Sequence, residues 1–305
     1  MQPLPRNIKK IQLIENIINE TDNDNPDLYI ETFNLPDGRS IHVVQDSVLI
    51  TGTKQRVAVK FVKKMIGKNS EIKILQYAGV WNGFGPLATA YAANKLKLRS
   101  EVFLSAVPTG SNLKTPLQKI EDSRQINTLH ALGAEIHLYP TYKQARNEEY
   151  EKSTVVIGKN EWSIKPEYMI MPMGLNDSEG IMIKMLGAAL KKAATDSIVK
   201  SHKTTRIWLV CGTGGIMRAI NTAFPKALLF ILFTGGGKYK DAASEWAISK
   251  KNITILDSLP ESELKQYSEE RKKYYKSVAG YDDQIWPYIK KFAQDGDIIW
   301  NVASD

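Results

Sequence analysis

The strongest constraint on the fold of this chain is the alternation of short strand-like segments with helix-like segments along most of its length. Strands that alternate with helices form βα units, which build a parallel sheet with both faces covered. The sequence therefore predicts an α/β fold. We expect strands at 71–78, 101–107, 134–140, 165–174, 205–212, 227–233, 252–258 and 296–303, and helices at 82–98, 115–133, 178–195 and 214–224.

Two regions depart from this alternation. The first 46 residues are polar, and we interpret them as an N-terminal arm followed by a hairpin around the turn LPDGRS. Residues 141–165 are charged and loop-like, and we interpret them as the return from a smaller inserted domain. A length of 305 residues is enough for one large or two medium domains.

Composition narrows the class of protein. The single cysteine, Cys211, excludes an intrachain disulfide and favours a reducing compartment. The N-terminus lacks the apolar core of a signal peptide, and the longest apolar run, ALLFILF at 227–233, is too short to span a bilayer. We therefore expect no membrane partner and a cytoplasmic location, which is the host cytoplasm if the chain is viral.

The formal net charge is +8, which indicates either an anionic partner such as nucleic acid or only a solvated basic surface. The lysines are spread along the chain, with small clusters such as those at 191 and 271. This distribution favours the solvated surface and leaves nucleic acid as an open alternative. No residues are assigned as metal ligands.

Lys54 lies in the turn GTKQR at 52–56, where a short strand gives way to a helix. The positive end of the helix dipole disfavours an ammonium group there, so the pKa of this lysine should fall. A lysine with a lowered pKa forms imines with carbonyl compounds. The alternative is an ordinary surface lysine, because the same helix carries lysines at 60, 63 and 64.

A second turn, CGTGGIM, joins a buried strand to a helix. The backbone N–H groups of such a turn converge on one point, and the helix dipole adds to their field. The sequence therefore predicts an anion site, usually a phosphate site, formed by Gly212, Thr213, Gly214 and Gly215. The alternative is a tight strand-to-helix turn without a ligand.

A third turn carries Asn82, in the stretch AGVWNGFGPLATAYAA at 78–93. An asparagine after a strand can bind a ligand at the carboxyl edge of the sheet, where open α/β sheets bind ligands. The alternative is a helix N-cap. The three turns, taken in order, indicate one site for an aldehyde that carries a phosphate. Pyridoxal 5′-phosphate (PLP) fits, with an imine to Lys54, its ring beside Asn82 and its phosphate on 212–215.

These motifs resemble those of the fold-type II PLP-dependent enzymes, the superfamily of tryptophan synthase β chain, cysteine synthase and threonine dehydratase. TGTKQR is most similar to the lysine motif of the aminocyclopropane-carboxylate deaminase and D-cysteine desulfhydrase branch. NGFGPLATAYAANKL resembles the asparagine loop of the superfamily, RQINTLHALGAEIHLYP a helix that ends in Gly-Ala-Glu, and GTGGIMRAI the phosphate loop. The resemblance extends over residues 45–305.

The resemblance implies two three-layer α/β/α domains with mostly parallel sheets. A small domain at 76–165 would be inserted in a large cofactor-binding domain formed by 1–75 and 166–305, and the assembly would be a homodimer. By this likeness Lys54 is the Schiff-base lysine, and Asn82 contacts the ring hydroxyl. The final strand, in DGDIIWNVASD, would supply Asn301 or Ser304 to the pyridine nitrogen.

The implied activity is that of a lyase or deaminase acting on a small amino acid. Lys54 would be displaced by the substrate amine and would then move the α-proton. A neutral group at the pyridine nitrogen favours β-elimination or β-replacement over transamination. Tyr77 and Tyr281 are both candidates for a second acid or base, and the sequence does not choose between them.

Two other enzymatic interpretations stay open. Val80 and Trp81 stand where the superfamily commonly has a serine that helps to hold the substrate carboxylate. With the basic charge, this suits an enzyme whose amino acid is linked or transferred to nucleic acid, as in phage-type thymine hypermodification. An NAD(P)-dependent oxidoreductase using the GTGG loop would need an acid after the next strand, where this chain has TGGGKYK. A non-catalytic binding module is disfavoured because Lys54 is present.

Overall fold

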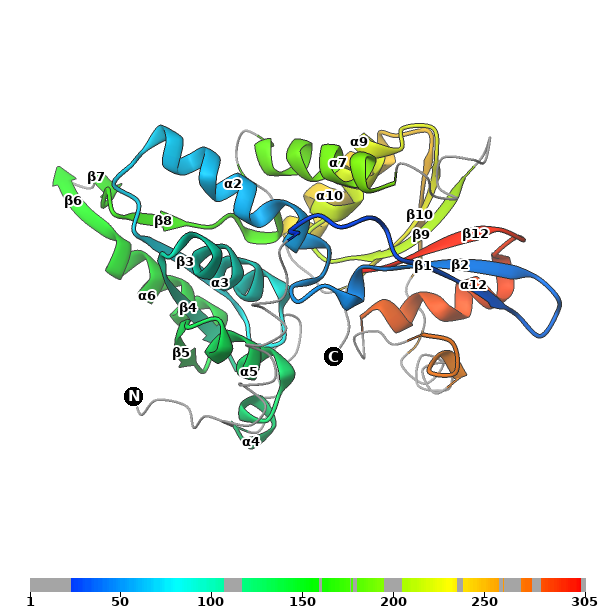
Figure 1. Cartoon of the computed structure of the whole chain (residues 1–305), viewed down its shortest axis with the longest axis horizontal. Coiled ribbons are helices and arrows are strands. Elements are labelled where there is room, and N and C mark those ends of the chain that lie inside the picture. The colour runs from blue at the N-terminus through cyan, green and yellow to red at the C-terminus, as the bar shows by residue number, and fades with distance from the viewer. Residues whose placement is uncertain are drawn as a thin grey trace. The chain divides into compact units, whose positions relative to one another are not determined.

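The computed structural model of the chain describes residues 23–106, 117–158, 161–175, 177, 180–194, 205–234, 238–257, 260, 270–275 and 281–302. The chain forms two compact units, drawn in Figure 1. The first unit holds residues 57–173, and the second holds residues 25–56 with the described residues from 174 onward. The domain boundaries expected from the sequence stay a prediction.

The second unit is built on a six-stranded sheet. Next to its antiparallel edge strand β1, the other strands run parallel to one another. Strands of a parallel sheet are covered on both faces, and runs such as LLFILF in β10 have the continuous apolar character that this requires. The strand order is β1 (Ile30–Asn34), β2 (Ser40–Gln45), β12 (Asp297–Asn301), β9 (Arg206–Cys211), β10 (Leu228–Phe233) and β11 (Ile253–Leu256).

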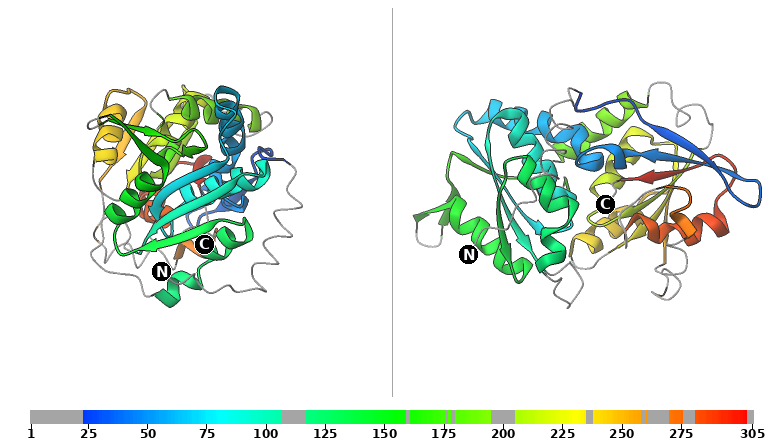
Figure 2. Two further views of the ribbon diagram at one scale, coloured as in Figure 1. Left: turned by 90° about the vertical axis from the view of Figure 1, so that its left-hand side faces the viewer. Right: turned by 60° about the horizontal axis from the view of Figure 1, so that its bottom comes forward.

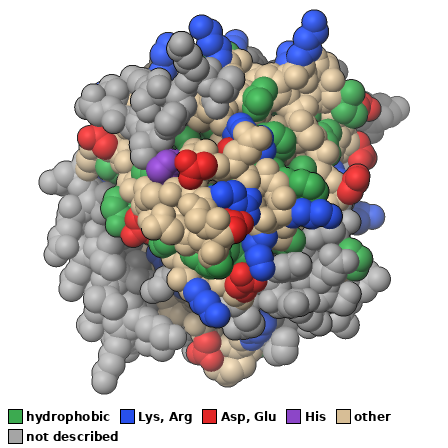
Figure 3. All heavy atoms as spheres, turned by 90° about the vertical axis from the view of Figure 1, so that its right-hand side faces the viewer, with side chains coloured by type: hydrophobic (Ala, Val, Ile, Leu, Met, Phe, Trp, Pro, Cys, Tyr) green, Lys and Arg blue, Asp and Glu red, His purple; other side chains and the backbone are tan. Residues whose placement is uncertain are grey.

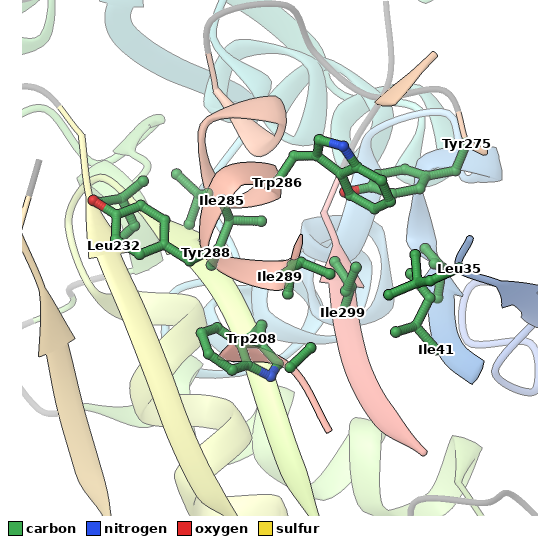
Figure 4. Close-up of a cluster of buried hydrophobic side chains, with 13 residues drawn as sticks. Leu35, Ile41, Trp208, Leu232, Tyr275, Ile285, Trp286, Tyr288, Ile289 and Ile299 are labelled. Carbon is green, nitrogen blue, oxygen red and sulfur yellow. The ribbon is translucent and has the colours of Figure 1, made fainter. Parts of the chain in front are cut away.

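Helices cover both faces of this sheet (Figure 1). On one face lie α7 (Ile181–Ala193), α9 (Gly215–Ala223) and α10 (Lys238–Ile248), and on the other lies α12 (Trp286–Phe292). Figure 4 shows the core beneath α12, where its side chains meet those of β9 and β12. Trp286, Trp208 and Ile299 are each no more than 1% exposed there. Burying side chains of this size supplies most of the driving force for folding of the unit.

The first unit has its own parallel sheet of four strands, with helices on both faces (Figure 2). On one face Tyr77 packs against Gly85 of α3, and on the other Phe103 packs against Ala145 of α6. The strand order is β5 (Glu135–Tyr139), β4 (Arg99–Ser105), β3 (Ile74–Val80) and β8 (Tyr168–Ile170). The helices are α2 (Gln55–Lys68), which begins in the second unit, α3 (Phe84–Leu96), α4 (Leu117–Glu121), α5 (Arg124–Ala131) and α6 (Tyr142–Ser153).

The predicted fold class is confirmed, because each unit is a three-layer α/β/α arrangement around a mostly parallel sheet. The expected N-terminal hairpin is also present: β1 and β2 pair antiparallel around a turn that contains Gly38 at φ +89°. Among the described residues, no helix is long and apolar enough to cross a membrane.

One predicted helix is two helices in the structure. The stretch 115–133 contains α4 and α5, separated at Asp122 and Ser123. The Ser123 hydroxyl accepts a hydrogen bond from the N–H of Ile126 at 3.2 Å, so a side-chain cap begins a new helix inside the periodic pattern. The glycine at the C-terminal end is as expected, since Gly133 has φ +75° after α5.

The prediction of a loop at 141–165 is wrong. This region contains α6 and a hairpin of β6 (Thr154–Gly158) and β7 (Glu161–Ile164). The Thr141 hydroxyl caps α6 by accepting from the N–H of Gln144. The charge of the segment reflects the wide solvent face of α6, and the hairpin keeps Trp162 64% exposed. Neither α6 nor the hairpin shows the periodic pattern of apolar residues from which the other helices and strands were predicted.

Glu149 of α6 is a buried carboxylate that completes the sheet of the first unit. Strand β8 pairs with β3 only as far as Gln76, so it leaves the next N–H on that side, that of Ala78, without a strand partner. The Glu149 carboxylate accepts a hydrogen bond from this N–H and forms an ion pair with Arg146. Burial raises the pKa of Glu149 to about 7. The side chain of Glu149 thus lies against the strand that leads to the Asn82 turn, and its protonated form is the favoured one below about pH 7.

This pKa makes the stability of the first unit depend on pH. The folded chain holds the Glu149 proton up to about pH 7, whereas an unfolded glutamate loses it near 4.5, so the folded state binds more protons between these values. The free energy of unfolding should therefore fall as pH rises from about 4.5 to about 7, by about 3 kcal/mol from this group. Urea unfolding across this range should show the slope in the wild type and not in Glu149→Gln. An equal slope in the variant would contradict the assignment.

Candidate functional site

The lysine turn follows the carboxyl end of β2. The chain leaves β2 at Gln45, passes through short 3₁₀ turns at Asp46–Val48 and Gly52–Lys54, and enters α2. Gly52 has φ +63°, a conformation that favours glycine. The N–H of Thr53 donates to the carbonyl of Val302 at 3.1 Å, just past the end of β12. Lys54 is therefore held at the carboxyl edge of the six-stranded sheet.

Arg56 fixes this turn from beneath. Its guanidinium forms an ion pair with Asp46 at 2.6 Å, and both side chains are only 1% exposed. It also donates to Asn25 Oδ1 at 2.9 Å and to the carbonyl of Pro26. The arginine of the TGTKQR motif is thus fully engaged inside the protein and positions the start of α2.

The Lys54 amino group lies in a partly buried environment. Burial lowers the pKa of Lys54 to about 8, while the nearby Asp282 and Cys211 oppose this shift. The sequence predicted a lowered pKa because of the helix dipole. The structure gives the same direction, and removal of the ammonium group from water is the main physical cause.

A pKa of about 8 should make Lys54 more reactive toward amine reagents than an exposed lysine such as Lys60. At pH 7 its neutral fraction exceeds that of an ordinary lysine by about 10²-fold. We expect an amine-directed acylating reagent to modify Lys54 before the exposed Lys60, as measured by peptide mass spectrometry across pH 6–10. In Asp282→Asn the midpoint should move to lower pH, because the carboxylate that raises the pKa of Lys54 is gone. A midpoint shared with Lys60 would contradict this assignment.

The glycine loop begins where β9 ends, beside β12 in the sheet. Gly214 is the N-cap of α9 with φ +78°, and a Cβ there would lie 2.6 Å from that of Ala243. Only glycine fits such a position. Within the described part of the chain, the N–H groups of Gly214, Gly215 and Ile216 have no acceptor. These three adjacent donors at a helix N-terminus form a site for an anion.

The other donors of the loop are already used. The Thr213 hydroxyl donates to the carbonyl of Gly174 at 3.1 Å. Gly174 has φ +59°, and a Cβ there would lie 1.9 Å from Thr213 Oγ1, so the two positions fit together only with glycine. The N–H of Gly212 is hydrogen bonded to the Tyr281 hydroxyl. Thr213 therefore has a structural contact beside the predicted phosphate contact.

Tyr281 and Asp282 complete this edge of the second unit. Burial and the neighbouring Cys211 and Asp282 raise the pKa of Tyr281 well above its ordinary value, so the phenol stays protonated. Asp282 is 1% exposed and interacts electrostatically with Lys54, Cys211 and Tyr281. Sequence reasoning named Tyr281 but missed Asp282, since no motif marks the pair and only the fold brings them beside the lysine turn.

Asn301, the last residue of β12, is fully buried in a polar network. Its Nδ2 donates to Gln45 Oε1 at 3.0 Å, and the Ser47 hydroxyl donates to the same oxygen at 2.9 Å. Gln45 in turn donates to Glu31. The network joins the ends of β2 and β12 directly beneath the lysine turn. Ser304, the other candidate from this segment, lies outside the described residues.

Asn82 belongs to the first unit, in the turn between β3 and α3. The alternative role of helix N-cap is wrong, because Gly83 occupies that position. The neighbouring N–H of Trp81 donates to the carbonyl of Ser105 at 3.2 Å, which fixes the turn to β4. The side chain of Asn82 has no hydrogen-bond partner among the described residues. Its place at a carboxyl strand end leaves it suited to a ligand, and its relation to Lys54 stays a prediction.

The second unit thus brings together most of the predicted residues. Lys54 follows the carboxyl end of β2, and the glycine loop follows that of β9. Asn301 is the last residue of β12, which lies between these two strands in the sheet and runs parallel to both. One edge of one sheet presents a lysine that deprotonates near neutral pH and an array of backbone donors for an anion. Such an edge can hold an aldehyde through the amine and a phosphate through the N–H groups.

By sequence, the chain matches no protein-family model and no curated protein. Its structure is similar to that of diaminopropionate ammonia lyase from Escherichia coli, with a TM-score of 0.61 and 12% identity over 100% of this chain and 89% of the other. A hydrogen sulfide-producing enzyme from Fusobacterium nucleatum gives a TM-score of 0.59 and 14% identity over 93% of this chain and 98% of the other. Threonine deaminase isoform 2 from Solanum lycopersicum gives a TM-score of 0.60 and 11% identity over 100% of this chain and 92% of the other.

These similarities confirm the predicted tryptophan synthase β-like fold, that of the fold-type II PLP enzymes. The aminocyclopropane-carboxylate deaminase branch is not confirmed by them. The E. coli lyase has also been solved in complex with an aminoacrylate–PLP azomethine reaction intermediate. At 10–14% identity, the likeness shows the fold of this chain and not its chemistry.

Proposed function

We propose that this chain is a PLP-dependent lyase or deaminase that removes the α-proton of an amino acid and catalyses elimination or replacement. The observation that carries the proposal is the pairing of Lys54, whose pKa is lowered to about 8, with the acceptor-free N–H groups of Gly214, Gly215 and Ile216. Both features lie at the carboxyl edge of one sheet.

The residues present fit this cofactor. Lys54 would hold its aldehyde, and the N–H groups of Gly214, Gly215 and Ile216 would hold its phosphate. Asn82 is proposed for the ring hydroxyl, and Asn301 or Ser304 for the pyridine nitrogen. When bound, PLP supplies an electron sink for the carbanion that forms after α-proton removal.

The chain's own residues then divide the proton transfers. Lys54 Nζ, neutral near pH 8, is the base that accepts the α-proton of the substrate. Tyr281 keeps its proton because its pKa is raised, so its hydroxyl stays a hydrogen-bond donor that can orient a leaving group, while the raised pKa makes it a weak general acid. Tyr77, the other candidate, is 7% exposed and packs under Gly85 of α3. Of the two, we propose Tyr281 as the hydroxyl near the base, because it shares the neighbours Asp282 and Cys211 with Lys54.

Asp282 places a buried carboxylate near Lys54. A buried carboxylate near Lys54 stabilises the ammonium form, so it limits the fall in the pKa of the lysine that burial alone would cause. It would also stabilise Lys54 in the moment after the lysine has accepted the α-proton. We assign Asp282 as a residue that positions and tunes the base rather than as a second base.

Several finer points belong to the proposal. An amino acid linked or transferred to nucleic acid is the second candidate substrate, favoured by the net charge of +8. An NAD(P) site is disfavoured, since β10 ends at Phe233 and Thr234 without the carboxylate that binds a ribose. We further propose a homodimer, a cytoplasmic location and a small domain at 76–165 between the two parts of a large one.

The test is covalent capture of the cofactor. Purified protein mixed with PLP should develop a visible absorption band, and borohydride should fix the cofactor on the peptide that carries Lys54, as located by mass spectrometry. With the loaded protein, amino acids should then exchange their α-proton for deuterium in D₂O, as followed by NMR. Absence of an adduct on Lys54 would overturn the proposal. An adduct without exchange of any free amino acid would favour the linked substrate.

A further inference from the structure

Helix α2 has an exposed face composed of lysine. Its fourteen residues, QRVAVKFVKKMIGK, include no Asp or Glu. Val59, Phe61 and Val62 are at most 3% exposed and face the protein. Lys60, Lys63 and Lys64 are exposed on the opposite side, three and four residues apart, and we name these three the α2 lysine face.

This arrangement is unfavourable for the isolated protein. Lysines at i,i+3 and i,i+4 repel one another, as Lys60 does with Lys63 and Lys64. Within the ranges that the structure describes, none of the three has a carboxylate within ion-pair distance, although other surface cations such as Lys290 do, at 2.8 Å from Glu270. A helix selected only for stability would carry Glu four residues before a lysine.

One other face of the protein carries charges of both signs. On the face drawn in Figure 3, Lys and Arg side chains lie among Asp and Glu side chains, so opposite charges are interspersed. The α2 lysine face lacks this mixture because its helix carries no acid. Helix α7 also carries no acid, but its Lys184 lies seven residues from Lys191, so its exposed lysines are spread over a longer stretch than those of the α2 lysine face. Its positive field is therefore not cancelled by neighbours on the same helix, and an external anion would cancel it.

We propose that the α2 lysine face binds the phosphate backbone of nucleic acid. From Lys60 to Lys64 the helix rises about 6 Å, close to the advance of two nucleotides along one strand of a duplex. Three ammonium groups on this spacing can contact neighbouring phosphates of one strand. Lysine is a point charge without the planar fork of arginine, so we expect contacts that do not depend on base sequence.

The chemistry of the helix favours nucleic acid over an anionic membrane. A helix that binds a bilayer surface inserts apolar side chains beside its basic residues. On α2 the apolar side chains of Val57, Val59, Phe61 and Val62 are buried against the protein, and those of Met65 and Ile66 are half-buried. What the face offers is charge alone, which matches a polyphosphate chain. This inference goes beyond the PLP chemistry and does not require it.

A charge-matched pair of variants tests the surface. Lys60→Gln/Lys63→Gln/Lys64→Gln removes three charges from α2, and the control Lys184→Gln/Lys191→Gln/Lys192→Gln removes three exposed lysines from α7. Binding of a fluorescent 20-base-pair duplex would be measured by anisotropy from 50 to 200 mM salt. Three phosphate contacts give a log–log slope of about −2.7 and, relative to 1 M salt, an affinity gain of about 500-fold at 0.1 M salt. The α2 variant should lose both, and the α7 variant less than about threefold.

Further variants make each outcome decisive. Lys60→Arg/Lys63→Arg/Lys64→Arg keeps the charge and should keep the binding, which excludes a folding defect as the cause of a loss. Equal losses in the α2 and α7 variants would show a net-charge effect and overturn the proposal, as would unchanged binding in the α2 variant. Binding to phosphatidylserine vesicles but not to the duplex would assign the face to a membrane. Cofactor capture on Lys54 should be the same in all variants, so the two proposals fail separately.

Discussion

Lys54→Ala is expected to abolish the covalent capture of PLP and to slow α-proton exchange by at least about 10³-fold. The variant removes both the amine that holds the aldehyde and the base that moves the proton, and a positioned base alone contributes about 10²–10⁴-fold. The lowered pKa of Lys54 is what makes it fit for both tasks near neutral pH. The measurement is deuterium exchange at Cα of the best substrate, together with the visible spectrum.

The matched control is Lys60→Ala. Lys60 lies on the same segment, six residues further on, and is exposed on α2, so its loss should leave capture and exchange unchanged. Lys54→Ala should unfold at the same urea concentration as the wild type or a higher one, because it removes a cation that is costly to bury. Retention of exchange activity in Lys54→Ala would show that another group is the base.

The largest expected loss of stability follows from breaking the Arg56–Asp46 ion pair. Both side chains are only 1% exposed, so Arg56→Gln leaves a buried carboxylate without its countercharge. Such a change costs about 3–5 kcal/mol in free energy of unfolding. Asp46→Asn should cost a similar amount, and the double variant less than the sum of the two, because neither charge is then left alone. Urea unfolding followed by circular dichroism measures all three.

An exposed ion pair serves as the comparison. Lys290 and Glu270 lie 2.8 Å apart with side chains 39% and 28% exposed, and Glu270→Gln should cost less than about 1 kcal/mol. If Arg56→Gln cost as little free energy of unfolding as Glu270→Gln, the prediction would be wrong, and the surroundings of Asp46 would have to rearrange so that water solvates its carboxylate. Because Arg56 holds the start of α2, its variant should also broaden the pH range over which Lys54 is acylated.

The parts of the candidate site that the sequence predicts are those where a short motif reflects a conformational or chemical requirement. Gly214 has to be glycine because of its positive φ and its contact with Ala243, and the sequence shows this need as GTGG before a helix. Lys54 was recognisable for a similar reason, at a turn between strand and helix. The alternation of apolar strands and helices likewise predicted parallel sheets, because a strand buried on both faces must be apolar throughout.

Other features depend on contacts that no local pattern contains. The helix α6 and the hairpin after it were missed, since α6 buries Ala145, Glu149 and Ser153 rather than an apolar stripe. The break between α4 and α5 depends on one hydroxyl, that of Ser123, inside an otherwise helical pattern. Such single hydrogen bonds contribute little to periodicity and decide where an element ends.

The sequence by itself determined the fold class and predicted the lysine and the glycine loop, because these rest on periodicity and on conformations that only certain residues adopt. The tertiary structure decided the environment of the lysine. Burial, and not the helix dipole, is the main cause of its lowered pKa, and Asp282 acts on it from a segment more than 200 residues away. Desolvation and long-range electrostatics depend on what surrounds a group in space, and folding alone brings those surroundings together.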